Sequence, residues 1–111
     1  PTRVRPETTI PSSATAFLLD CCPPDFRQYA VLRRHPIVLA RFAAQSVDAQ
    51  VRACTAGLGE CRAGLADVVP AGAIEDATEA WKDQLAALRR TAREVSLIER
   101  ALRGAAFVPK L

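Results

Sequence analysis

The sequence has 111 residues, of which 50% are hydrophobic and 24% are charged, and its formal net charge is +3 at pH 7. This length and composition are typical of one globular domain, exclude a multidomain enzyme, and are too apolar for a disordered chain. No run approaches the roughly 20 apolar residues that a membrane-spanning helix needs.

Residues 1–21 are predicted to be an extended arm that ends in a short helical turn. Three of the eight prolines fall within residues 1–11, and this stretch has no apolar period. Arg3 and Arg5 are followed by Glu7 and not by an apolar run, so no secretory signal is expected. The expected compartment is therefore the cytoplasm.

Two short helical pieces are predicted before the long ones. Residues 12–13 are serines that can cap a helical turn over residues 14–20. Its apolar side, which we expect to dock as a lid, consists of Phe17, Leu18 and Leu19. A short helix is predicted over residues 22–34, and Pro36 disfavours helix at His35.

A long helix is predicted over residues 36–69, because Pro36 suits the first position of a helix and the next proline is Pro70. Apolar or small residues recur in it with alternating spacings of four and three. These positions are Ala40, Ala44, Val47, Val51, Cys54, Leu58, Cys61, Leu65 and Val68. After a turn at residues 69–72, a second long helix is predicted over residues 73–103. Its matching positions are Ile74, Thr78, Trp81, Leu85, Leu88, Ala92, Val95, Ile98 or Glu99, and Leu102.

Two helices with this repeat and a short connection predict an all-α fold, an antiparallel helical hairpin. A period of 3.5 residues is what left-handed knobs-into-holes packing requires. The charges at the helix ends agree, since Glu75 and Asp76 fall in the first turn of the last helix and Arg100 and Arg103 in its last turn. Gly104 is expected to end that helix, and residues 104–111 are expected to form a tail.

Three glycines interrupt the first long helix, and each costs about 1 kcal/mol relative to alanine. They are Gly57, Gly59 and Gly64. Folding the chain about residue 70 or 71 places Trp81 opposite residue 60, so we expect the glycines to make room for the indole against Leu58 and Cys61. The alternative is that the helix breaks at residues 57–59.

The hairpin is expected to have a partner, because two helices each bury one stripe and leave their flanks exposed. Residues 37–43 are apolar on almost every side, as in a helix that is buried on several sides. We therefore predict a homodimer that forms an antiparallel four-helix bundle. The alternatives are a monomer in which residues 1–34 wrap the hairpin and a complex with a different protein.

The cysteines are interpreted as reduced thiols and not as disulfides. They are Cys21, Cys22, Cys54 and Cys61. On one helix Cys54 and Cys61 lie about 10.5 Å apart, too far for a disulfide or a shared metal ion, so they are core residues or form a bridge between two chains. Cys22-Pro23 resembles the Cys-Pro dipeptide of haem-responsive proteins, with His35 as a second axial ligand. Proline in the first turn of a helix explains the same dipeptide, and no cofactor is predicted.

Charge is unevenly distributed, with net values of +3, −4 and +4 for residues 1–41, 42–80 and 81–111. A hairpin would therefore have an acidic turn end and a basic open end. The residues that we predict to bind an anionic partner there are Arg33, Arg34, Arg41, Arg93 and Arg100, with Arg103 close to them. The alternative is an ordinary solvated surface, since 13 arginines against two lysines are typical of a GC-rich genome.

Catalysis has little support in the sequence. The chain has one histidine and contains neither a glycine-rich phosphate loop nor a Glu-x-x-His pair. We therefore predict a non-enzymatic helical interaction or adaptor protein that self-associates and docks a protein partner. The alternatives are a nucleic-acid-associated regulatory protein that uses the same arginines and, with less support, a thiol or haem sensor at Cys22-Pro23.

Overall fold

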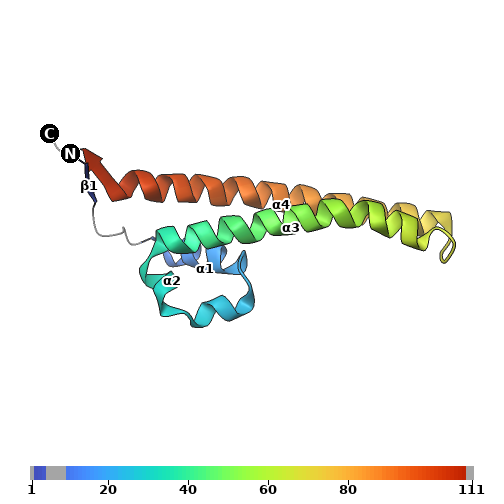
Figure 1. Ribbon diagram of the computed structural model, residues 1–111, viewed down its shortest axis with the longest axis horizontal. Helices are drawn as coiled ribbons and strands as arrows, with labels where there is room; N and C mark the ends of the chain where they lie inside the picture. The colour runs from blue at the N-terminus through green and yellow to red at the C-terminus, as the bar shows by residue number, and fades with distance from the viewer. Residues whose placement is uncertain (1, 5–9, 110–111) are drawn as a thin grey trace.

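The computed structural model describes residues 2–4 and 10–109 of the chain, with side chains described for residues 10–104. The protein is a rod of 66 × 30 × 19 Å, built on two long antiparallel helices (Figure 1). Helix α3 spans Pro36–Leu65 and helix α4 spans Ala71–Ala106. The predicted all-α antiparallel helical hairpin is therefore confirmed.

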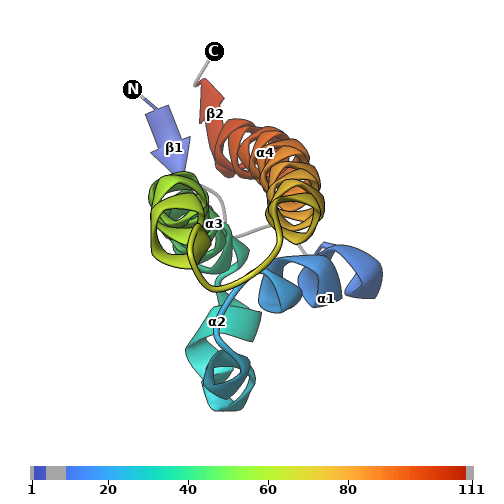
Figure 2. The same cartoon turned by 90° about the vertical axis from the view of Figure 1, so that its right-hand side faces the viewer.

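A small third layer covers the half of the hairpin near its open end. Helix α1 spans Ser12–Asp20, the 3-10 helix η1 spans Pro24–Gln28 and helix α2 spans Ala30–Arg34. Helices α1 and α2 lie against the first half of α3, α1 reaches the side of α4, and η1 lies farther out, beyond α1 and α2 (Figures 1 and 2). No side-chain cap precedes α1, which follows Pro11 directly, so the predicted serine cap is wrong.

The two ends of the described chain meet at the open end of the hairpin. Strand β1, Thr2–Val4, pairs antiparallel with strand β2, Phe107–Pro109. The arm predicted over residues 1–21 thus begins with a strand, and its residues 5–9 lie outside the described residues. The tail predicted from residue 104 is wrong in its first part, because α4 continues to Ala106 before β2 begins.

The bounds of three predicted helices are corrected. The helix over residues 22–34 is split into η1 and α2, because Tyr29 has an extended backbone with φ −88° and ψ 105°. Helix α3 begins at Pro36 as predicted but ends at Leu65 and not at residue 69, since residues 66–70, the last of which is Pro70, make the connection to α4. Helix α4 is longer than residues 73–103 at both ends, since it begins at Ala71, directly after Pro70, and continues through Gly104, which keeps a helical conformation, to Ala106.

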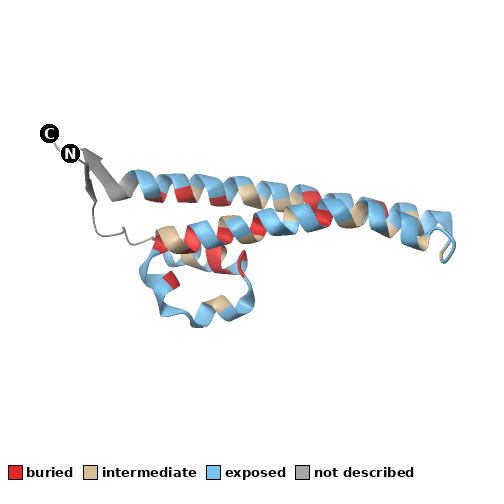
Figure 3. Cartoon of the chain, in the orientation of Figure 1, coloured by how far each residue is buried: buried red, intermediate tan, exposed pale blue. Residues whose placement is uncertain are grey.

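Where the third layer covers the hairpin, the core combines some of the predicted heptad positions with Leu39 and Ala43, which lie outside the predicted stripe and are fully buried. Val47 and Val95 are fully buried between α3 and α4, and Leu85 and Leu102 continue the stripe. Leu18 of α1 and Leu32 of α2 belong to the same buried cluster. Figure 3 shows that the buried positions lie mainly in the half of the hairpin beside α1 and α2. Toward the turn Thr78 is buried, but most predicted core positions are only half-buried and Val68 is 72% exposed, because two helices alone shield one stripe each.

Trp81 fixes the register between the two helices. Its indole Nε1 donates a hydrogen bond to the carbonyl oxygen of Cys54, and the Cys54 thiol lies 3.8 Å from the carbonyl oxygen of Trp81. A Cβ on Gly57 would lie 2.7 Å from the indole, so Gly57 provides the room, whereas Gly59 and Gly64 have no neighbour there. The predicted register, with Trp81 opposite residue 60, is wrong by about one turn, since the connection is centred on residue 68 and not on residue 70 or 71. The alternative break in α3 is also wrong, because that helix is continuous.

Candidate docking surface

The open end of the hairpin carries a polar groove between α3 and α4. Its volume is about 240 Å³, and Arg41 of α3 faces Ser96, Glu99, Arg100 and Arg103 of α4 across it. The spacing of the α4 residues places them on adjacent turns of one face. Arg41 meets them because it lies in the second turn of α3, beside the last turns of the antiparallel α4.

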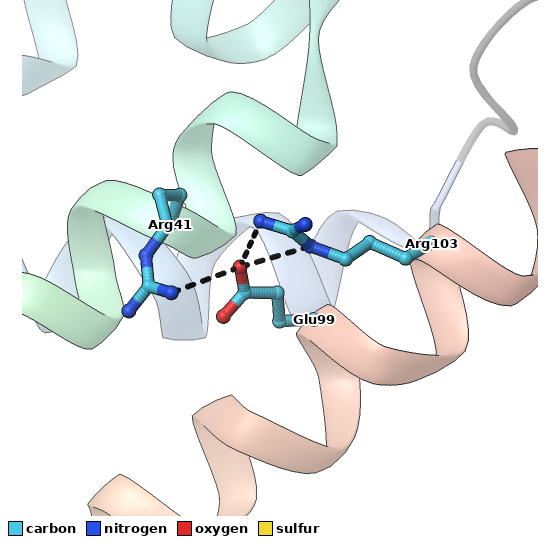
Figure 4. A network of polar contacts seen from close by, with 3 residues as sticks. All are labelled: Arg41, Glu99 and Arg103. Atoms are coloured by element: carbon cyan, nitrogen blue, oxygen red, sulfur yellow. Dashed lines mark hydrogen bonds and ion pairs between the residues drawn. The ribbon is translucent and has the colours of Figure 1, made fainter.

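The carboxylate of Glu99 links the two sides of this groove, because it contacts arginines of both α3 and α4 (Figure 4). Glu99 is 8% exposed, and its Oε2 accepts hydrogen bonds from Arg103 Nε at 3.2 Å and Nη2 at 2.8 Å. Arg41 Nη1 reaches the same oxygen at 3.5 Å, so the ion pair crosses from α4 to α3. The guanidinium groups of Arg41 and Arg103 stabilise the buried carboxylate of Glu99. Because both bind the same oxygen, that oxygen also holds the two groups in position.

The groove keeps a positive charge after this pairing. Three guanidinium groups, including that of Arg100, surround the single carboxylate of Glu99. The net charge of the open half of the molecule is also positive, because residues 10–52 and 84–104 hold ten basic and five acidic residues. Residues 53–83, toward the turn, hold two basic and six acidic residues, so the hairpin has a basic end and an acidic end.

The structure brings together only part of the predicted arginine cluster. Arg41 and Arg100 line the polar groove, but Arg33 lines a separate groove of about 450 Å³ between α1 and α2. Arg34 is exposed in the last turn of α2, and Arg93 is exposed two turns before Arg100 on α4. Sequence reasoning took Glu99 only as an alternative core position, although its four-residue spacing from Arg103 is a signal for an ion pair.

A second groove, which the sequence analysis missed, is apolar. It holds about 350 Å³ and is lined by Pro23, Phe26, Phe42, Gln45 and Ser46. The Phe26 and Phe42 rings lie 5.8 Å apart, and Phe42 is 41% exposed. The signal in the sequence was the pair of prolines that starts η1 and directs Phe26 toward α3.

The vicinal cysteines are poor candidates for a reactive site. Cys21 and Cys22 are buried, and burial raises the pKa of Cys21 to about 11, with the neighbouring Cys22 adding to the shift. Burial also raises the pKa of Cys22, although Arg27 opposes the shift. Both therefore remain neutral thiols near pH 7, whereas the thiolate is the nucleophile and metal ligand.

Within residues 10–104, no three His, Cys, Asp or Glu side chains are grouped closely enough to hold a metal ion. In the described part of the chain, no helix combines the length and the apolar character that crossing a membrane requires. No protein-family model, curated protein or solved structure matches the chain.

Proposed function

We propose that this protein is a non-enzymatic helical interaction protein that self-associates and docks an acidic surface of a partner protein. The observation that supports docking is the groove in which Arg41, Arg100 and Arg103 surround the single carboxylate of Glu99. Guanidinium groups bind carboxylates through two parallel hydrogen bonds, and an ion pair within the groove holds two of them in position. The proposal includes a reducing, cytoplasmic compartment, which the four free cysteines favour.

Self-association is supported by the incomplete cover of the hairpin. The third layer ends before the turn, and from there Trp81 is 37% exposed while Leu58, Leu65 and Ile74 are only half-buried. Two-fold dimers are the commonest way for a chain to cover such a surface.

The test of docking measures binding of a fluorescein-labelled oligoglutamate peptide by anisotropy at low and physiological salt. Replacing both Arg41 and Arg103 with alanine is expected to weaken binding by about tenfold or more, because two cations leave the groove. Glu99→Gln keeps both arginines and removes the single negative charge, so it is expected to tighten binding. The matched control replaces Arg52 and Arg62, exposed arginines of α3 outside the groove, and is expected to bind like the wild type.

The two groove variants act in opposite directions, so a general loss of fold cannot imitate the expected pattern. If Glu99→Gln and the control both weaken binding as much as the double alanine variant, the groove is not the docking site. Tight binding of unrelated DNA or RNA oligonucleotides, with a steep loss of affinity as salt rises, would instead favour the nucleic-acid alternative.

A further inference from the structure

The outward face of α4 carries a charge pattern of its own. Eight positions follow one another with alternating spacings of three and four residues, which keeps them on one face of the helix. We call them the α4 seam, and they are Asp76, Glu79, Asp83, Ala86, Arg90, Arg93, Leu97 and Arg100. All eight side chains are exposed, and the acidic residues come before Ala86 while the arginines come after it.

The seam is complementary to itself when a second copy runs antiparallel. In that arrangement, positions at equal distances on either side of residue 88 face each other. Asp83 then faces Arg93 of the second copy, and Asp76 faces Arg100, and the two-fold axis repeats each pair. Ala86, which is small, lies opposite Arg90, and Glu79 lies opposite the apolar Leu97, so no like charges meet along the seam. A parallel pair would instead place every charge against its own copy.

We propose that the α4 seam is the contact with a second copy of this chain, with the two α4 helices antiparallel about a two-fold axis near residue 88. This inference rests on the self-association in the proposed function, but it assigns the contact to the charged outward face of α4 and not to the half-buried apolar residues near the turn. The seam is available because α4 packs on α3 with its opposite side, and the seam residue that shares a groove with α1, Leu97, is still 62% exposed. The matched pairs extend over residues 76–100, about 36 Å of helix.

The seam predicts an association that depends on charge and not on apolar burial. Its opposed pairs are exposed in the single chain, where screening by salt is strong, so the dimer is expected to weaken as the salt concentration rises. Pairing the basic half of one α4 with the acidic half of the other also brings the basic end of each hairpin to the acidic end of its neighbour.

The experiment is a charge swap at Asp83 and Arg93, read by sedimentation equilibrium of the full chain at low salt. Asp83→Lys creates two repulsive pairs in a symmetric dimer, as does Arg93→Glu, so each variant alone is expected to dimerise on the order of tenfold more weakly. The two variants mixed together, and the double variant D83K/R93E, restore an opposite charge at every contact. Both are expected to regain the wild-type dissociation constant.

Matched controls carry the same charge changes on α3. Glu60→Lys and Arg52→Glu alter exposed residues outside the seam, and we expect them to leave the dissociation constant within about twofold. Equal weakening in these controls, or failure of the mixture and of the double variant to recover, would overturn the seam. A wild-type chain that stays monomeric at low salt and at a concentration of about 1 mM would overturn it as well.

The result is separable from the docking proposal. Arg100 borders both the polar groove and the seam, but Asp83 and Arg93 do not line the groove. Unchanged dimerisation in the charge-swap variants, together with weaker peptide binding after loss of Arg41 and Arg103, would refute the seam alone. Weaker dimerisation in the charge-swap variants, together with unchanged peptide binding after loss of Arg41 and Arg103, would refute the docking groove alone.

Discussion

Replacing Gly57 with alanine is expected to destabilise the hairpin, although the same replacement in an open part of a helix stabilises it. Alanine gains about 1 kcal/mol of helix propensity over glycine. The new Cβ would lie 2.7 Å from Trp81 Cζ2, about 1 Å inside an ordinary carbon–carbon contact. Overpacking of this kind costs about 1 to 3 kcal/mol, so we expect a net loss of about 1 kcal/mol.

Gly59 provides the matched control in the same helix. A Cβ there meets nothing within 4 Å, so Gly59→Ala is expected to gain about 1 kcal/mol. The two variants should therefore differ by about 2 kcal/mol with opposite signs. Urea denaturation followed by circular dichroism measures both, and the fluorescence of Trp81, the single tryptophan, reports whether the indole has moved.

A second background isolates the contact itself. In Trp81→Leu the indole is gone, so Gly57→Ala is expected to become stabilising, like Gly59→Ala. The reasoning is refuted if Gly57→Ala stabilises the wild-type chain as much as Gly59→Ala does. It is equally refuted if the cost of Gly57→Ala persists after the indole is removed, because the cost would then come from some other neighbour.

Two further predictions concern the core and the buried thiols. Leu85→Ala should cost about 2 kcal/mol in urea denaturation, because Leu85 is 9% exposed, whereas Leu97→Ala, at 62% exposure, should cost less than about 0.5 kcal/mol. Equal costs would show that the stripe between α3 and α4 is not the core. Burial raises the pKa of Cys21 from 9.0 to about 11, so above pH 9 the unfolded chain loses a proton that the folded chain keeps. The free energy of unfolding should therefore fall between about pH 9 and pH 11, and by less in Cys21→Ala. Identical pH profiles for the wild type and Cys21→Ala would contradict a buried, neutral thiol at this position.

Local signals in the sequence predicted the candidate site only in part. The basic character of the open end follows from charge counts, and Arg41 and Arg100 were both selected. Arg33 was selected with them, but it lines a groove with residues of α1 and not the polar groove between α3 and α4. No spacing rule relates α2 to α4, so sequence reasoning could not separate the arginines of the groove from those elsewhere.

The sequence by itself determined the hairpin, because a heptad repeat is a local property that each helix carries in its own residues. Pro36 set the start of α3 for the same reason, through its fixed φ and missing N–H. Only the tertiary structure decided the register, which places Trp81 over Gly57, and the ion pair between Arg41 and Glu99. These contacts join residues far apart in the chain, so they depend on where the connection closes and on how the short elements pack. A shift of a few residues in that connection moves every cross-helix contact by about one turn while leaving the local pattern unchanged.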